Sequence, residues 1–131
     1  MTFYGPELND GKHVFVFGSN WGGIHGAGAA KTALDHWGAI LKVGQGRQGM
    51  AYGIPTKDRL LRPLPLADIE KGVHEFKEYA RQHPELTFLV TRVGCGLAGY
   101  SDSQIHPFFE DSPDNCVMPD DYWGKPCISP S

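Results

Sequence analysis

Residues 87–105, TFLVTRVGCGLAGYSDSQI, combine a strand, a glycine-rich turn and the start of a helix in one stretch. The apolar run 88–93 has no alternation of polar and apolar residues, which is typical of a strand covered on both faces. It ends in GCGLAG (94–99), whose three glycines lose much conformational freedom on folding. Ser101 and Gln104 then fit a helix capping box. This order predicts a parallel α/β sheet in which bare backbone after the strand meets a ligand.

The rest of the chain alternates strands and helices in the same way. One apolar stripe at helical spacing runs along the longest helix, formed by Leu66, Ile69, Val73, Phe76 and Ala80. Strands are predicted at 13–17, 50–56, 86–93 and 115–118, and helices at about 29–37, at 66–80 and from Ser101 or Ser103 onward. The stretch 39–49 fits either a strand or a loop packed over the site. We therefore expect an α/β fold with three layers, α/β/α, and a mostly parallel sheet with helices on both faces.

Length and composition limit the classes of protein that the chain can represent. With 131 residues, 40% hydrophobic and 21% charged, it reads as one domain, 1–131, with a core at about 13–118 and a loop-like tail at 119–131. No signal peptide, anchor or spanning segment is readable, so we expect a cytoplasmic protein with no membrane partner. A net charge of −3 argues against a broad nucleic-acid surface. The three cysteines and six histidines lack ligand spacing, so neither a metal nor another cofactor is expected.

A second glycine-rich stretch, GSNWGGIHGAGAA (18–30), leads from a predicted strand into a predicted helix. Free backbone N–H groups and the positive end of the helix dipole favour an anion at such a position, most often a phosphate. The spacing matches neither a dinucleotide-binding fingerprint nor a P-loop. Two glycine-rich turns at neighbouring strand ends suit a diphosphate better than a single phosphate. Each glycine-rich stretch taken alone is also consistent with an ordinary tight turn that binds no ligand.

Together, GSN…HGAGAA…ALDHWGA, IPTKD and RVGCGLAGY resemble the macro-domain superfamily, whose members bind ADP-ribose. The similarity covers residues 13 to about 118. It is strongest to the branch of ADP-ribosylglutamate hydrolases with the related DNA-directed antitoxin hydrolases, and to small uncharacterised bacterial and phage proteins. The resemblance implies that Asn20 contacts the distal ribose and that Lys57 attacks its anomeric carbon. It also implies two diphosphate loops, one of Gly26, Ala27 and Gly28 and the other of Gly94, Cys95, Gly96 and Leu97.

The chain departs from that branch at two positions. Ala98 stands where the branch has its catalytic aspartate, and no strand ending in Gly-Asp, which binds the adenine amine, is readable near the N-terminus. Asp58 and Asp102 are the acids placed to serve as base instead. Lys57 itself is either a nucleophile, which requires a neutral amine, or a surface lysine.

Other residues of the two glycine-rich stretches have both a functional and a structural interpretation. His25 contacts phosphate or ribose, or it caps its loop, and Cys95 is either a thiolate nucleophile or a small buried residue. Tyr100 is the aromatic side chain best placed to stack on a ligand ring. The remaining candidate ligand contacts are Gly18, Ser19, Thr56, Ala98 and Gly99.

Three functions remain open from the sequence. The first is an enzyme that removes ADP-ribose from a modified macromolecule or from a small derivative. The second is a module that binds ADP-ribose or a related diphosphate without chemistry, which Ala98 favours. The third is a phage or mobile-element accessory protein whose nucleotide pocket regulates a partner.

Overall fold

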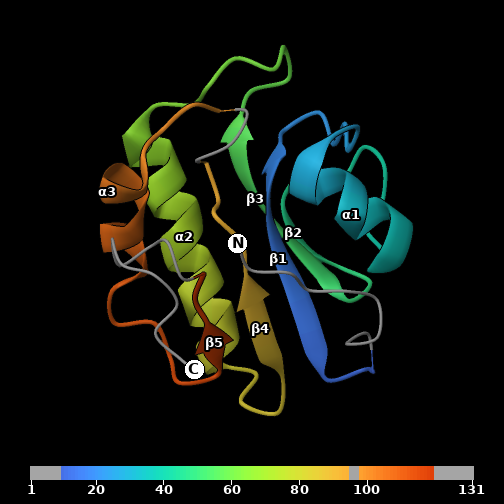
Figure 1. Cartoon of the computed structure of the whole chain (residues 1–131), viewed down its shortest axis with the longest axis vertical. Coiled ribbons are helices and arrows are strands. Elements are labelled where there is room, and N and C mark those ends of the chain that lie inside the picture. Colours follow the sequence, from blue (N-terminus) through green and yellow to red (C-terminus); the bar gives the residue numbers. More distant parts are fainter. Residues whose placement is uncertain (1–9, 95–97, 120–131) are drawn as a thin grey trace.

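The centre of the fold is a five-stranded sheet whose middle strand is parallel to both of its neighbours (Figure 1). The computed structural model describes residues 10–94 and 98–119. β1 (His13–Asn20) pairs in parallel with both β3 (Ala51–Lys57) and β4 (Thr87–Val90). β5 (Cys116–Val117) joins β4 in parallel, and β2 (Gly46–Gln48) joins β3 antiparallel, giving the order β2–β3–β1–β4–β5. The predicted α/β fold with a mostly parallel sheet is confirmed.

Apolar side chains on both faces of β1 explain why its sequence does not alternate. Val14 and Val16 belong to the core beside α2 (Leu66–Arg81), whereas Phe15 and Phe17 belong to the core beside α1 (Gly28–His36). α3 (Asp102–Ile105) and the 3₁₀ helix η2 (His106–Phe109) lie on the α2 side (Figure 1). A strand with helices on both sides buries the side chains of both its faces, which explains why residues 14–17 are all apolar.

The apolar stripe predicted for the long helix is confirmed. The side chains of Ile69, Val73, Phe76 and Ala80 are completely buried against the sheet, and Leu66 packs at the edge of the same core. α2 ends at Arg81, two residues before the predicted His83–Pro84 boundary. α1 ends at His36, and Gly38 follows with φ +82, the left-handed conformation expected of a glycine after a helix.

Several predicted boundaries differ from the observed ones, and β1 continues to Asn20 rather than ending at residue 17. β4 ends at Val90 rather than at residue 93, because the chain turns there: Thr91 donates from its N–H and its hydroxyl to the Val16 carbonyl oxygen, and Val93 N–H donates to Thr91. The capping box at Ser101 and Gln104 is present, so Ser101 is the N-cap residue and α3 begins at Asp102 rather than nearer Ser103. Pro107 falls in η2, where the change to 3₁₀ geometry accommodates its ring near the start of a new turn.

The ambiguous stretch 39–49 is mostly loop and contains the short antiparallel strand β2 at the edge of the sheet. None of the helices within 10–94 and 98–119 is long and apolar enough to cross a lipid bilayer.

Candidate ligand site at the carboxyl ends of the strands

The carboxyl ends of β1, β3 and β4 meet at one edge of the sheet, as expected for parallel strands. Asn20 is in register with Lys57, and the Thr56 hydroxyl donates to the Ser19 carbonyl oxygen at 3.2 Å. Four predicted site residues that are distant in sequence therefore lie together at this edge. In open α/β sheets, this is the edge at which ligands bind.

The N-terminus of α1 is open to solvent. Ala27 is the N-cap residue and makes no side-chain capping hydrogen bond, and the first turn contains no acidic residue. Gly26, Ala27 and Gly28 are exposed, and a Cβ atom placed on either glycine would meet nothing within 4 Å. No side chain of the described residues caps the first backbone N–H groups of this nine-residue helix, and an uncapped N-terminus is the arrangement that binds anions.

The turn after β4 lies directly on the end of β1. A Cβ placed on Gly18 would stand 3.3 Å from the Gly94 nitrogen. Gly94 has φ +80, and its carbonyl oxygen accepts the Tyr100 N–H at 3.0 Å, which closes the segment between them. Cys95, Gly96 and Leu97 lie outside the described residues. Ala98 is buried, and Gly99 is exposed with φ +87.

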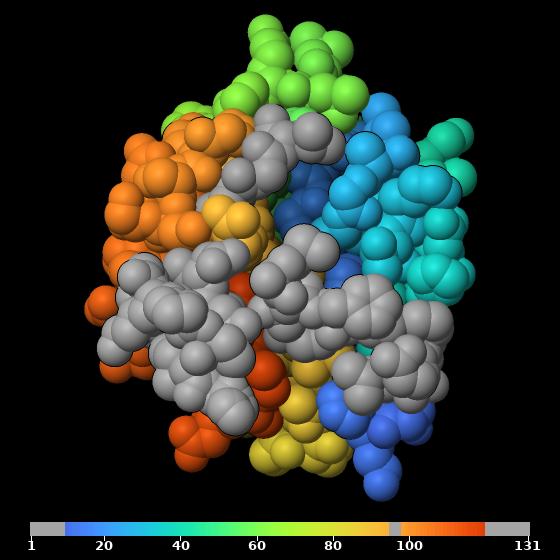
Figure 2. Space-filling view, in the orientation of Figure 1, coloured from blue at the N-terminus to red at the C-terminus, as the bar shows by residue number. Residues whose placement is uncertain are grey.

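The two glycine-rich turns therefore approach the same part of β1 from two sides. Figure 2 shows the surface hollowed between the start of α1, in light blue, and the end of β4, in gold, with atoms of β1 visible in dark blue. Among the described residues, Gly94 and the loop that leads into α1 thus both lie near the carboxyl end of β1.

Tyr100 is tied to the protein through its hydroxyl group. Its hydroxyl donates to the Leu64 carbonyl oxygen at 2.5 Å, and its partly buried ring packs against the α2 core. This hydrogen bond gives Tyr100 a bracing role between the turn and the segment before α2, and stacking of its ring on a ligand stays a prediction.

Lys57 ends β3 and is half-buried. Its carbonyl oxygen accepts the Trp21 N–H at 3.0 Å, which fixes its backbone beside β1. Its amine has no hydrogen-bond or ion-pair partner in residues 10–94 and 98–119. Of the three candidate catalytic side chains, it is the one whose functional group remains uncommitted.

Asp58 is occupied in a turn. One carboxylate oxygen accepts the N–H groups of Leu60 and Arg62 at 2.8 and 3.0 Å, and the other accepts Arg62 Nε at 2.9 Å. The backbone hydrogen bond from Arg62, followed by those from Leu60 and the Arg62 side chain, lowers the pKa of Asp58. A carboxylate held in this way is a poor general base.

Asp102 is occupied as well, at the first residue of α3. Arg92 Nε and Nη2 each donate to one of its carboxylate oxygens at 2.9 Å. This bidentate pair joins the chain after β4 to the start of α3 and so frames the segment 94–99. Neither proposed substitute for the missing family aspartate is therefore free in this structure.

Asn20 and His25 hold the first glycine-rich loop in shape. The Asn20 amide donates to the Ile24 carbonyl oxygen at 2.8 Å and accepts the Ile24 N–H at 2.9 Å. The His25 ring is buried, and its Nε2 lies 3.0 and 3.1 Å from the carbonyl oxygens of Ile40 and Val43. Because both partners are acceptors, Nε2 carries the proton, and the loop-capping interpretation of His25 fits these contacts.

The stretch 39–44 adopts the loop that the sequence allowed as one of two possibilities, and its contacts with the loop after β1 were not predicted. Lys42 N–H donates to Gly23 at 2.9 Å, and a Cβ atom on Gly23 or Gly44 would collide with the facing backbone. The glycines of this region thus allow two loops to pack backbone against backbone. The high frequency of glycine in this part of the sequence is a sign of close backbone packing, but the sequence does not indicate which loop is the packing partner.

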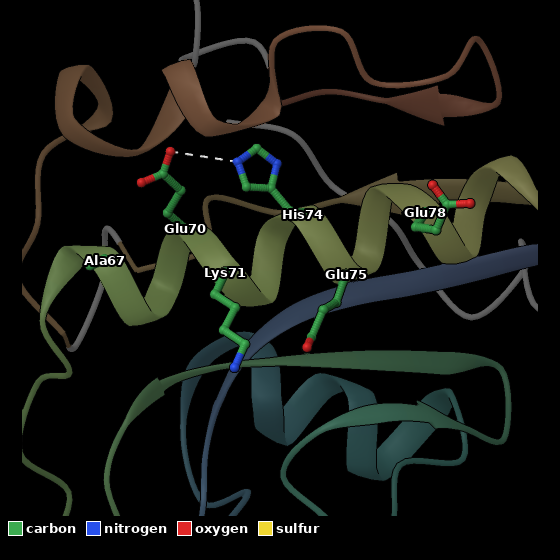
Figure 3. A pocket seen from close by; sticks show the side chains of 6 residues that line it. All are labelled: Ala67, Glu70, Lys71, His74, Glu75 and Glu78. Carbon is green, nitrogen blue, oxygen red and sulfur yellow. Dashed lines mark ion pairs between the residues drawn. The ribbon is translucent and has the colours of Figure 1, made fainter.

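A separate shallow hollow of about 510 Å³ lies on the outer face of α2 (Figure 3). It is lined by Ala67, Glu70, Lys71, His74, Glu75 and Glu78. The Glu70–His74 ion pair of 3.5 Å crosses one side of it. None of the predicted site residues lines it, and we do not connect it with the strand-end site.

No group of three or more His, Cys, Asp or Glu side chains in the described ranges is arranged to hold a metal ion. No protein-family model, no curated protein and no solved structure matches the chain.

Proposed function

We propose that the protein binds ADP-ribose, or a closely related nucleoside diphosphate, between the N-terminus of α1 and the turn after β4. The uncapped, exposed first turn of α1 carries this proposal, because its N–H groups have no partner within the described protein and no acidic side chain competes for them. The contact between Gly18 and Gly94 supports it by bringing the second glycine-rich turn to the same strand end.

The sequence resemblance to the macro-domain superfamily names the ligand. A diphosphate flanked by two riboses suits two converging turns with Asn20 and Lys57 at the neighbouring strand end. As part of this proposal, the helices on the two faces of the sheet form the three-layer arrangement of that superfamily within a single domain. The proposal also places the protein in the cytoplasm, where cysteines such as Cys116 stay reduced.

Binding without chemistry is the form of this function that the geometry supports best. Ala98 supplies no catalytic group, and the carboxylates of Asp58 and Asp102 are held by Arg62 and Arg92. Hydrolysis of an ADP-ribosyl linkage is the second candidate, favoured by the uncommitted amine of Lys57 in register with Asn20.

Calorimetric titration with ADP-ribose tests the proposal, with AMP, ribose 5-phosphate and NAD as comparison ligands. We expect micromolar affinity for ADP-ribose, about −8 kcal/mol, and much weaker binding of the single-phosphate ligands. Equal affinities for AMP and ADP-ribose would remove the two-turn diphosphate site. No binding of any of the four would remove the ligand assignment.

An assay with ADP-ribosylated substrates distinguishes binding without chemistry from hydrolysis of an ADP-ribosyl linkage. If ADP-ribosylated protein or nucleic acid is turned over, Lys57→Ala should abolish turnover and keep ADP-ribose binding. Absence of turnover together with intact binding assigns the protein as a binding module.

A further inference from the structure

Exposed apolar side chains are concentrated on one part of the molecule. In residues 10–94 and 98–119, seven large hydrophobic side chains are exposed, and six of them lie on three loops at the carboxyl edge of the sheet. These six, here called the loop patch, are Trp21, Ile24, Ile40, Leu41, Leu60 and Leu61, with exposures from 44% to 70%. Clustered apolar exposure of this kind marks an interaction surface.

The three loops form one continuous surface. Lys42 N–H donates to Gly23 at 2.9 Å, which joins the loop 39–44 to the loop after β1. A Cβ atom on Gly22 would stand 3.7 Å from the Arg59 carbonyl oxygen, which joins that loop to the turn after β3. Figure 1 shows this last turn, in green, reaching beyond the end of the sheet.

The protruding turn is held rigidly with its leucines in solvent. The Asp58 carboxylate accepts hydrogen bonds from Leu60, from the Arg62 backbone and from the Arg62 side chain. Leu61 has φ +65, a left-handed conformation that costs energy for a residue with a side chain. Strain maintained by a dedicated set of hydrogen bonds indicates that this display of Leu60 and Leu61 has a use.

The same loops are strongly basic in an acidic protein. The segments 20–24, 39–44 and 57–62 carry four basic side chains, Lys42, Lys57, Arg59 and Arg62, against the single carboxylate of Asp58. Their net charge is +3, whereas the whole chain has −3. A basic surface on an acidic protein favours an anionic partner.

We propose that the loop patch docks on an anionic lipid bilayer, with Leu60 and Leu61 at the boundary between headgroups and acyl chains and with the basic side chains among the headgroups. Protruding aliphatic side chains beside cations suit a lipid bilayer, in which apolar acyl chains lie beneath negatively charged headgroups. A nucleic acid also presents phosphates, but it has no apolar layer into which leucine and isoleucine side chains insert. Two copies meeting patch to patch would place +3 against +3.

A surface of this kind requires no membrane-spanning segment. The sequence argument against a membrane partner rested on the lack of a spanning or anchoring stretch, which does not bear on loops that enter only the interface. The loop patch contains none of the exposed residues at the α1 N-terminus, and only Lys57 of its basic set also borders the proposed ligand site, so the proposal does not depend on nucleotide binding.

The test is co-sedimentation of the full chain with vesicles of phosphatidylcholine alone or with about 30 mol% phosphatidylglycerol, at about 0.15 M and 0.5 M salt. We expect binding to the anionic vesicles, weakened at least tenfold at high salt. Leu60→Asp should lower the partition coefficient at least tenfold. Leu60 is 70% exposed, so an unchanged thermal midpoint checks that this variant is folded.

Val117→Asp is the matched control, because Val117 is the seventh exposed apolar side chain, 43% exposed on β5, and lies outside the patch. Its binding to vesicles should equal that of the wild type. Absence of binding to anionic vesicles overturns the proposal, and so does an equal loss in both variants. Concentration-dependent dimerisation that Leu60→Asp abolishes, without vesicle binding, would overturn it in favour of a second copy as the occupant.

Discussion

Gly18 in β1 lies against the backbone of Gly94 in the turn after β4. A methyl group on Gly18 would stand 3.3 Å from the Gly94 nitrogen and 3.6 Å from both Thr56 Cγ2 and Val93 Cα. Three strand ends thus meet around one position that has no side chain. The bare backbone of Gly18 is needed for this packing, and the packing sets how the second glycine-rich turn faces the proposed diphosphate.

Gly18→Ala should therefore destabilise the protein and weaken ligand binding together. We expect a loss of about 1 kcal/mol in the free energy of unfolding, because the Gly94 backbone must shift by a few tenths of an ångström. Denaturant unfolding and ADP-ribose calorimetry measure the two effects. Gly26→Ala is the control for stability, since a Cβ atom there meets nothing within 4 Å. Equal stability of the two variants would contradict the packing role of Gly18.

Ala27→Asp should raise stability while it abolishes anion binding. Ala27 has φ −155 and ψ 161, the extended conformation of an N-cap residue, and it makes no side-chain cap hydrogen bond. An aspartate there would accept the free N–H groups of α1 and add about 1 kcal/mol to the free energy of unfolding. The same carboxylate would repel a diphosphate, so we expect at least a tenfold loss of ADP-ribose affinity.

Opposite changes in stability and affinity cannot arise from misfolding, which makes this variant a sharp test of the site. Ala27→Asn supplies a neutral cap as the matched control, and it should keep more of the affinity than the aspartate does. A variant that is stabilised and still binds ADP-ribose normally would show that the ligand lies elsewhere.

Arg92 and Asp102 should behave as a coupled pair that positions the turn between them. Arg92→Ala and Asp102→Ala each break a bidentate contact of 2.9 Å, and the double variant should lose less stability than the sum of the two. We expect a coupling energy of about 0.5 kcal/mol, because water reaches both side chains. Urea unfolding of the four proteins measures it, and strict additivity would show that the pair contributes nothing.

The sequence alone was sufficient to predict the structural elements that depend on local sequence patterns. The α2 stripe is readable because Ile69, Val73 and Phe76 recur at helical spacing, and the capping box at Ser101 depends only on a residue three positions later. The apolar run of β1 revealed burial on both faces because helices cover both sides. Each of these features is decided by neighbours within a few residues or by burial alone.

Contacts between distant segments were not readable. The pairing of Arg92 with Asp102 depends on how the turn after β4 folds back, and the packing of Gly44 against Asn20 joins loops 24 residues apart. The exposure of Leu60 and Leu61 was also not predictable from the sequence, because two apolar residues before a helix are compatible with burial in the core and with exposure at the surface. The sequence therefore made Asp58 and Asp102 candidate bases without indicating their arginine partners, and it did not predict the loop patch.

His25→Ala should release the loop 39–44 from the loop after β1. The buried His25 ring donates from Nε2 toward the Ile40 and Val43 carbonyl oxygens and packs edge-on against Phe17, with ring centroids 5.3 Å apart. Loss of these contacts should cost about 2–3 kcal/mol of stability. Hydrogen exchange should then accelerate most at 39–44. Uniform acceleration over the whole chain would instead indicate a general loss of stability.

The Cys116 thiol should be inert in the native protein. Burial raises the pKa of Cys116 from 9.0 to about 12, since the thiolate is poorly solvated there. At pH 8 the thiolate population is lower by a factor of about 10³ than for a free thiol, so alkylation of Cys116 should require denaturant. Peptide mass spectrometry after iodoacetamide treatment measures this at Cys116 specifically. Modification of the native protein at the rate of the denatured protein would contradict the burial of this thiol.

The same raised pKa predicts the direction of a stability change in alkali. The unfolded chain releases the Cys116 proton above about pH 9, whereas the folded protein holds it until about pH 12. The contribution of the Cys116 thiol to the free energy of unfolding is therefore fully present below pH 9 and is lost as the pH rises toward 12. Relative to Cys116→Ala, the wild type should lose about 1 kcal/mol by pH 10, a value reduced for partial access of water. Because the Tyr52 hydroxyl, whose pKa is also raised to about 12, is present in both proteins, its effect cancels in the difference. Parallel pH profiles for the two proteins would show that the thiol ionises as freely in the folded state as in the unfolded one.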